Sequence, residues 1–381
     1  MPQLADSSSP GVADSDRRPV RRYYDPANDA TAQNLLALAM LLGALVYAFH
    51  SYDSADFTTV ENIKRGLALA AGAFLLIGLL VFPSGPFAWP HPIFWRVVFG
   101  VSFLYELALI VLLALRRDDA RQAFTFLYPE LGKELQERAY ADHCDLTWTN
   151  LEPTIFDIFF VSQFLGWVFK AIMLRDRMFC WTLSIGWELI ETAFTHMLPN
   201  FAACWWDQWI VDVPLAGGLG IYVGHRIARH LEETHSWTRV RWRRLGLIRH
   251  FMVYTAIALS FYLVDLNAFF LKHILWVPPE NKLNLYRLVL WWLIGAVSLR
   301  QIYMYMDNPN IMRLGLQVWI AIAILFTELL IVFKFGRDGV LDTPTPPSVL
   351  SAWTALGSVF VTFFVWMAIH RDDASAAPDR R

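Results

Sequence analysis

Charged residues are scarce in this chain. Of its 381 residues, 17% are charged and 56% are hydrophobic, whereas a soluble globular domain has roughly 25% charged residues. This deficit excludes an ordinary soluble domain and indicates a membrane protein. A net charge is also lacking, because 32 Lys and Arg stand against 34 Asp and Glu. Without a basic field to attract it, nucleic acid is excluded as a partner.

Cysteine is scarce as well. The chain has three cysteines, Cys144, Cys180 and Cys204, which are too few and too scattered for a disulfide framework or a four-thiolate zinc site. We therefore interpret them as small, buried apolar side chains. The sequence shows neither an internal repeat nor a Gly/Ser linker, so no second domain is expected.

Long apolar runs are abundant, and most approach the roughly 20 residues that cross a bilayer core. We place ten of them, at residues 33–49, 66–82, 94–115, 155–174, 178–197, 205–225, 247–270, 286–305, 314–333 and 350–369. They predict an all-α integral membrane protein, a polytopic bundle of about ten transmembrane helices around a polar cavity, over residues 31–370. Residues 1–30, without the apolar core of a signal peptide, are predicted to be a disordered cytoplasmic tail. Residues 371–381 form a second, short cytoplasmic tail.

The loops predict the orientation, because Lys and Arg are held preferentially on the cytoplasmic side. With ten spans and a cytoplasmic N-terminus, that side collects most of the basic residues, including the arginines at 17–22 and at 226–249. The segment 229–250 is either a cytoplasmic loop or a basic amphipathic helix on anionic lipid. The turn at Pro199 then opens on the far side, which is the lumen in a eukaryote or the periplasm in a bacterium.

Carboxylates gather around this turn. Glu188 and Glu191, three residues apart, project from one face of a helix, where each ionised group costs about 2.5 to 3.5 kcal/mol. Asp207 and Asp212 follow the turn, to which Asn200 adds an amide oxygen. On a regular helix these two aspartates differ by about 140 degrees, so they share a site only between helices or near an irregular helix start. Such an all-oxygen cluster suits Ca²⁺ or Mg²⁺ rather than zinc.

A structural alternative stays open for these acids. They could pair with Lys170, Arg175 or Arg226 and hold the bundle together. Further ionisable side chains lie within apolar stretches: Glu106, Asp157, Lys170, Asp265 and Glu328. Together they predict a polar cavity in the membrane, as in transporters and in enzymes that act on lipid head groups.

The residues around the turn belong to a longer pattern. Leu198-Pro199-Asn200-Phe201, then Cys204-Trp205-Trp206-Asp207-Gln208 and Asp212, resemble the signature of phosphatidylserine synthases of the base-exchange type. Further matches follow in order from about residue 60 to 340: Phe82 to Phe87 with Trp95-Arg96, Gly166-Trp167 with Lys170, Trp187-Glu188 with Glu191, Phe269-Phe270-Leu271-Lys272-His273, and Lys334-Phe335-Gly336. A collinear resemblance of this length is specific.

This resemblance implies a membrane enzyme that replaces the choline or ethanolamine head group of phosphatidylcholine or phosphatidylethanolamine with L-serine, without CTP and with Ca²⁺ as cofactor. The family acts in the endoplasmic reticulum membrane; a bacterial member would lie in the inner membrane. The roles carried over are metal ligands (Glu188, Glu191, Asp212, Asn200), a catalytic residue (Asp207) and substrate-binding residues (Arg96, Lys170, Trp206). For Arg96, a snorkelling residue at the interface is an equal alternative. The oligomeric state stays open, with a homodimer as one alternative.

Two positions depart from the family pattern. Gln163 stands where the family usually has a histidine that acts as proton acceptor, and Ala203 stands where members commonly carry a glutamate. The candidate catalytic residues are Asp207, His196 and Gln163. An amide does not take up a proton at neutral pH, so the proton acceptor is His196, Asp207 or a metal-bound carboxylate. The alternatives are exchange with another amino alcohol and a non-catalytic or transport-type lipid-binding protein on the same scaffold.

Overall fold

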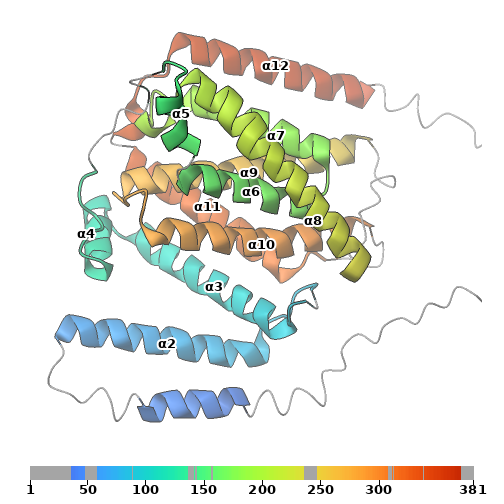
Figure 1. Ribbon diagram of the computed structural model, residues 1–381. Helices are drawn as coiled ribbons and strands as arrows, with labels where there is room; N and C mark the ends of the chain where they lie inside the picture. The colour runs from blue at the N-terminus through green and yellow to red at the C-terminus, as the bar shows by residue number, and fades with distance from the viewer. Residues whose placement is uncertain are drawn as a thin grey trace, which may run out of the picture. The chain divides into compact units, whose positions relative to one another are not determined.

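The computed structural model describes residues 36–47, 58–87, 89–135, 141, 144–155, 158–235, 247–307, 311, 313–337 and 339–369 (Figure 1). Contacts divide the chain into two compact units, Met1–Val81 and Phe82–Arg381. The first unit contains a short apolar helix, Leu36–Tyr47, and α2 (Thr59–Val81). The predicted tails and residues 236–246 of the basic segment lie outside the described residues.

Each predicted apolar stretch coincides with a helix or a pair of helices. In the second unit these are α3 (Pro92–Ala114), α6 (Ile158–Leu174), α7 (Arg177–Phe194), η2 (Asp207–Gly218) with α8 (Leu219–His235), α9 (Leu247–Ile274), α10 (Lys282–Asp307), α11 (Leu316–Gly336) and α12 (Pro347–Ile369). Within the described ranges no strand occurs, and six helices (α2, α3 and α9 to α12) are long and apolar enough to cross a membrane. The all-α integral membrane fold is confirmed, and the count of ten spans stays a prediction.

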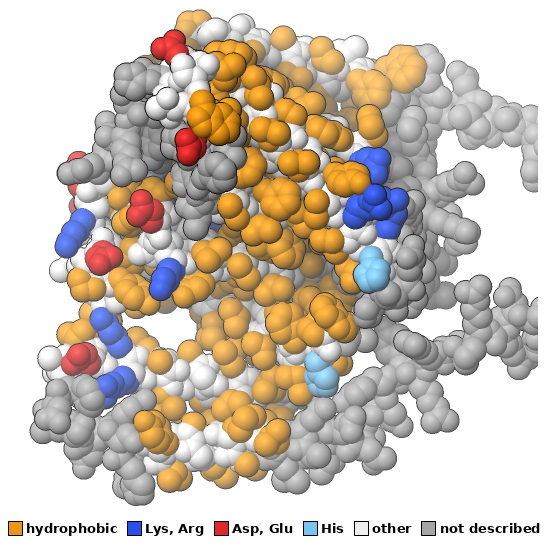
Figure 2. Space-filling view, viewed as in Figure 1, with side chains coloured by type: hydrophobic (Ala, Val, Ile, Leu, Met, Phe, Trp, Pro, Cys, Tyr) orange, Lys and Arg blue, Asp and Glu red, His pale blue; other side chains and the backbone are white. Residues whose placement is uncertain are grey.

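The visible surface of the second unit has the charge distribution of a membrane protein. In Figure 2, hydrophobic side chains fill the middle of the face over α7, α8 and α10, and the coloured Lys, Arg, Asp and Glu side chains lie toward the helix ends. The exposed apolar side chains of α7 and α8 include Met178, Leu189 and Tyr222. In lipid such exposure is favourable, because the bilayer core is itself apolar.

Two glycines bring α8 close to α6. A Cβ atom at Gly220 would lie 2.7 Å from the carbonyl oxygen of Phe164, and one at Gly224 would lie 2.5 Å from that of Val168. Any larger residue would therefore push the two helices apart, as expected where membrane helices pack through small residues. Since η2 also packs against α6 and α7, this close contact fixes the position of η2.

Two short helices lie at one end of the second unit, α4 (Arg117–Leu127) and α5 (Trp148–Ile155) (Figure 1). Arg121 of α4 donates two hydrogen bonds, of 3.0 and 2.8 Å, to the carbonyl oxygen of Ile274 at the end of α9. Its guanidinium also lies 3.4 Å from the ring centre of Trp276. A cation at a helix C-terminus satisfies carbonyls that have no partner within the helix, so α4 caps α9.

Candidate active site

α7 positions the first two carboxylates. The helix starts after Asp176, whose side chain accepts hydrogen bonds from the N–H of Phe179 at 3.0 Å and from the hydroxyl of Tyr254 at 2.8 Å. This N-cap satisfies a free backbone donor and ties the start of α7 to α9. Farther along α7, Glu188 is only 1% exposed, and its Oε2 atom has no hydrogen-bond partner. A buried oxygen without a donor is unfavourable by about 1–3 kcal/mol, which indicates a ligand-binding role.

A π-helix brings the two aspartates onto one face. In η2 the hydrogen-bonding pattern is that of a π-helix from Asp207 to Gly218, in which each N–H bonds to the carbonyl five residues earlier. Residues five apart therefore lie nearly one above the other, and Asp207 and Asp212 are five apart. Pro214 lies inside this helix and has no N–H to donate to a regular α-helical ladder. The sequence predicted that Asp207 and Asp212 share a site between helices or near an irregular helix start. The π-helix η2 is such an irregular helix.

Four carboxylates converge where α7 meets η2. Glu188, Glu191, Asp207 and Asp212 lie close enough to repel one another electrostatically. Within the described part of the chain, none of the four forms an ion pair with Lys or Arg. A group of partly desolvated carboxylates without a basic partner is costly unless a cation joins it.

The side chains that could have neutralised this cluster are engaged elsewhere. Lys170 forms an ion pair of 2.6 Å with Asp265 of α9. Arg226 donates to the hydroxyl of Tyr222 at 2.9 Å, and Arg175 donates to a backbone carbonyl. For the described residues, the alternative that the four acids pair with these bases is therefore wrong.

The donor set fits a hard divalent cation. All four groups offer carboxylate oxygens, the ligands that Ca²⁺ and Mg²⁺ prefer, and the unpartnered Oε2 of Glu188 leaves a lone pair free for one. Asn200 lies in the 3₁₀ turn Pro199–Phe201, and its side chain is outside the described residues. Among the side chains that the structure describes, no three Asp, Glu, His or Cys are grouped tightly enough to hold a metal ion. Holding a cation therefore requires the carboxylates to move closer together.

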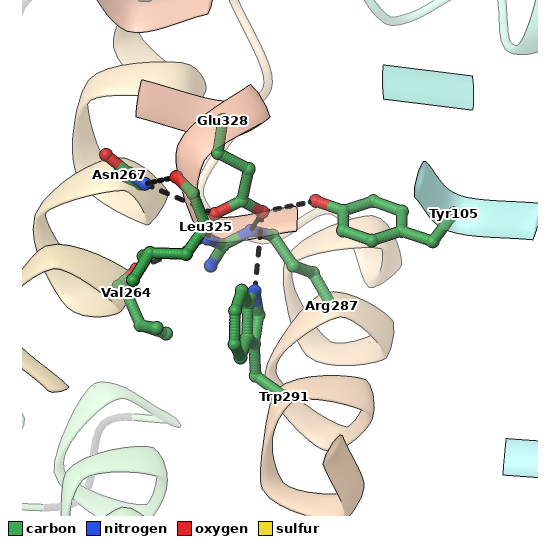
Figure 3. Close-up of polar contacts among 7 residues, drawn as sticks. All are labelled: Tyr105, Val264, Asn267, Arg287, Trp291, Leu325 and Glu328. Atoms are coloured by element: carbon green, nitrogen blue, oxygen red, sulfur yellow. Dashed lines mark hydrogen bonds and ion pairs between the residues drawn. The ribbon is translucent and has the colours of Figure 1, made fainter. Parts of the chain in front are cut away.

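Glu328 of α11, a second buried carboxylate, has its own partners (Figure 3). It is 0% exposed and accepts hydrogen bonds from Arg287 at 2.9 and 2.6 Å. The hydroxyl of Tyr105 donates to it at 2.6 Å and the indole of Trp291 at 3.3 Å. These residues belong to α3, α10 and α11, and Asn267 of α9 donates to Glu328 at 3.4 Å, so the network joins four helices.

Most of the ionisable groups that predicted a polar cavity have partners in the described structure. Lys170 and Asp265 neutralise each other, Glu328 is paired with Arg287, and Thr327 donates to Glu106 at 2.8 Å. Asp157 lies outside the described residues. Glu106, like the four carboxylates at α7 and η2, forms no ion pair in the described part of the chain, and its Oε2 atom is buried without a partner.

The proposed catalytic side chains occupy different surroundings. Gln163 lies on α6, one turn before Trp167, which is buried against α7 and α8. His196 lies just beyond α7, and both of its ring nitrogens are buried without a partner. Asp207 is the first residue of η2, and it lies close enough to Asp212 for their carboxylates to repel each other. Asp207 is itself one of the four clustered carboxylates.

The predicted substrate-binding residues are likewise dispersed. Arg96 donates from Nε to the hydroxyl of Ser84 at 3.0 Å, at the start of α3. Trp206 is 3% exposed and packs with Cys204 and Val211, with its indole N–H unpartnered. Lys170 is held by Asp265. Trp206 is thus the one that adjoins the carboxylate-bearing η2.

Ser184 is a polar side chain of α7 that the sequence did not identify as part of the site. Ser184 lies one turn before Glu188 on α7 and is 1% exposed, and its hydroxyl has no partner. It faces η2, because a Cβ atom at Gly217 would lie 2.8 Å from its Oγ atom. The four-residue spacing to Glu188 was the available signal, but a serine in an apolar helix more often bonds to its own backbone.

The cysteines also differ from expectation. Cys144 and Cys204, 60 residues apart in sequence, form a disulfide with a Cα–Cα distance of 5.2 Å. Only Cys180 is a free, buried thiol, as predicted. The disulfide joins the segment before α5 to the segment that enters η2. Two isolated cysteines carry no sequence signal for pairing until the fold brings them together, which is why the interpretation as apolar side chains was wrong for this pair.

A cavity of about 590 Å³ lies elsewhere in the second unit. Its lining comes from α3, α6 and α10 and includes Trp95, Phe169, Met173, Trp292 and Arg300. None of the four clustered carboxylates lines it. The carboxylate cluster, which carries ionisable groups without a basic partner, is therefore the candidate active site. This mostly apolar cavity is not.

Comparison with known proteins gives the family. The family model described as phosphatidyl serine synthase matches residues 90–235 and 233–336. The chain belongs to the phosphatidylserine synthase family. It is 34% identical to phosphatidylserine synthase 2 of Homo sapiens, over 97% of this chain and 83% of that protein. It is 37% identical to phosphatidylserine synthase 1 of Danio rerio, over 88% of this chain and 78% of that protein.

A plant relative carries a different name. The chain is 36% identical to CDP-diacylglycerol–serine O-phosphatidyltransferase 2 of Oryza sativa subsp. japonica, over 90% of each protein. Membership of the phosphatidylserine synthase family confirms the resemblance found in the sequence and gives phosphatidylserine synthesis as the activity. The substrates are accordingly a phospholipid and serine, and the setting is a membrane.

Proposed function

We propose that this phosphatidylserine synthase works by calcium-dependent base exchange. L-Serine replaces the choline or ethanolamine of an existing phospholipid, and no CTP is consumed. The observation that supports this proposal is the set of four carboxylates at α7 and η2 without a basic partner among the described residues. Glu188, Glu191, Asp212 and Asn200 would hold the cation. When bound, Ca²⁺ supplies positive charge beside the oxygens of the phosphate.

The exchange requires one bond to form at phosphorus and one to break. The serine hydroxyl oxygen attacks the phosphorus, and the bond from phosphorus to the oxygen of choline or ethanolamine breaks. The hydroxyl proton must leave the serine and reach the departing alcohol. A side chain within hydrogen-bond reach of both oxygens serves this transfer, and direct displacement needs no covalent enzyme intermediate.

Asp207 is the side chain that we assign to this proton transfer. It belongs to the carboxylate cluster, whereas Gln163 has an amide that does not accept a proton at neutral pH. His196 is the alternative acceptor, because its two ring nitrogens are buried and unpartnered. Removal of a general base lowers the rate by about 100-fold to 10,000-fold. A loss of this size in Asp207→Asn, with a small effect of His196→Ala, is the expected pattern.

A second candidate reaction uses CDP-diacylglycerol as the phosphatidyl donor. The name of the rice relative favours it. The two reactions differ in the leaving group, which is cytidine monophosphate in one and choline or ethanolamine in the other. The carboxylate cluster is compatible with both, so the donor must be tested directly.

We further propose that the site faces the lumenal or periplasmic side. Cys204, three residues before Asp207, is joined to Cys144 by a disulfide, and disulfides persist in oxidising compartments. The positive-inside distribution of Lys and Arg supports the same side. In a eukaryotic cell the membrane would be that of the endoplasmic reticulum.

The test uses purified protein in detergent with labelled serine. One arm offers phosphatidylcholine and phosphatidylethanolamine without CTP, in calcium or in chelator, and the other arm offers CDP-diacylglycerol. Base exchange predicts calcium-dependent labelling of lipid in the first arm. Labelling in the second arm alone would replace base exchange with the second candidate.

A further inference from the structure

Several Lys and Arg side chains of the second unit have partners within the described part of the chain. Lys170 pairs with Asp265 and Arg287 with Glu328, both at 2.6 Å. Lys334 donates to two backbone carbonyls at the end of α3, at 2.6 and 2.7 Å. Lys272, in the last turn of α9, is partly buried, but within the described part of the chain its ammonium forms neither an ion pair nor a hydrogen bond.

An aromatic cluster connects Lys272 to the candidate active site. The ammonium of Lys272 lies 4.9 Å from the ring centre of Phe269. The Phe269 ring packs against those of Phe201 and Trp187, with centre-to-centre distances of 4.9 and 5.8 Å. Phe201 follows Asn200 directly, and Trp187 precedes Glu188. Lys272 therefore contacts an aromatic cluster in which two rings, Phe201 and Trp187, are the sequence neighbours of proposed metal-binding residues, and it pairs with none of the four carboxylates.

The position of Lys272 along α9 matches the level of lipid phosphates. The helix is long and apolar enough to span the membrane, and Lys272 lies within three residues of its end at Ile274. Lysines at such positions keep an apolar stem in the protein and hold the ammonium at the interface. A free ammonium at this level attracts an anionic head group.

We propose that Lys272 binds the phosphate of the phospholipid donor, a proposal that rests on the proposed function. The donor's phosphodiester is an anion that must approach a site with four carboxylates. Even one divalent cation leaves that cluster with an excess of negative charge. Lys272 supplies a positive charge that no described protein group neutralises, and it holds this charge against the aromatic cluster of Phe269, Phe201 and Trp187.

Removal of the charge separates this role from a structural one. A lysine that stabilises the fold has an anionic partner, and its loss lowers the Tm. Lys272 has none in the described structure, so its replacement breaks no ion pair. Lys272→Met is therefore expected to leave the Tm unchanged or raise it. Lys272→Arg keeps the charge and Lys272→Gln removes it with less change in polarity. Lys282→Met, at an exposed lysine at the start of α10, is the matched control.

Two measurements test the proposal. The first is calcium-independent binding of a fluorescent phosphatidylcholine to purified protein in chelator, with free inorganic phosphate as competitor. The second is kcat/KM for the lipid donor and KM for serine. We expect Lys272→Met and Lys272→Gln to weaken lipid binding and lower kcat/KM for lipid about 10- to 100-fold. The KM for serine, and the behaviour of Lys272→Arg and Lys282→Met, should stay near those of the wild type.

The outcomes are distinguishable. Unchanged lipid binding in both neutral variants would overturn the proposal, as would a rise in the KM for serine alone, which would assign Lys272 to the serine carboxylate. Complete competition by millimolar phosphate would show a general anion site instead of a lipid site. Absence of serine exchange in the wild type would reject the proposed function, and the binding measurement would still decide the role of Lys272.

Discussion

Glu188 is the residue at which burial and charge conflict most strongly. It is 1% exposed, has an oxygen without a hydrogen-bond partner, and lies among three other carboxylates. Glu188→Gln removes one of these charges, so we expect the Tm in chelator to rise by about 2 °C. The rise in Tm that calcium produces in the wild type should be lost. Thermal unfolding in detergent, with and without calcium, measures both effects.

Glu152→Gln is the matched control for this prediction. Glu152 is an exposed acid on α5, and its variant should melt like the wild type under both conditions. A lower Tm of Glu188→Gln in chelator would show that the carboxylate stabilises the fold, and would contradict a ligand-binding role for it.

Glu328 and Arg287 show the opposite behaviour, because each satisfies the other. Removal of one partner leaves a buried charge alone and costs about 3–5 kcal/mol. We therefore expect Arg287→Met to lower the Tm strongly and Arg287→Met with Glu328→Met to restore most of the loss. A double variant as unstable as the sum of the two single variants would contradict a direct pair.

At the scale of the element, the π-helix determines which residues share a face. In a regular α-helix the residue on the same face as Asp207, one turn on, would be Val211. In the π-helix η2 it is Asp212. We expect Val211→Asp with Asp212→Val to lose activity as completely as Asp212→Asn, about 100-fold. Phosphatidylserine formation by the folded variants is the measurement. Recovery of activity in the exchanged variant would show an α-helical register in the active protein.

The disulfide between Cys144 and Cys204 is the second feature that positions η2. It ties the entry of η2 to the segment before α5, and Cys180 is the free thiol. In denatured protein, a maleimide should label one cysteine before reduction of the disulfide and three cysteines after it. Sealed vesicles with active protein then test the side on which the disulfide lies. A membrane-impermeant reductant added to the lumenal or periplasmic face should lower activity, and Cys144→Ala should lower it similarly. Three reactive thiols without reduction would contradict the pairing.

Local rules predicted part of this site. The three-residue spacing of Glu188 and Glu191 was enough to place both on one helix face. The alignment of Asp207 with Asp212 was not predictable, because Pro214 disfavours a regular α-helical ladder without specifying the π-helical hydrogen bonds of η2. The pairing of Cys144 with Cys204 depends likewise on contacts between segments far apart in the sequence.

At the scale of the whole molecule, hydrophobic runs predicted the all-α membrane fold because a bilayer requires helices that satisfy their own backbone. The sequence did not predict which residues pair with the ionisable side chains inside the membrane. Lys170 was expected to bind substrate or to neutralise the cluster, and it pairs with Asp265 from α9. Which acids are paired and which are free emerges only once helices distant in sequence have packed together.

The central claim is that the unpaired carboxylates serve calcium-dependent exchange of head groups. The most direct measurement follows choline or ethanolamine released from head-group-labelled phospholipid, together with serine incorporated, in purified protein without CTP. We predict release and incorporation in equal amounts, dependence on calcium, and a loss on the order of 100-fold in Glu191→Gln but not in Glu152→Gln. Serine incorporation without head-group release, or equal activity in chelator, would contradict the account.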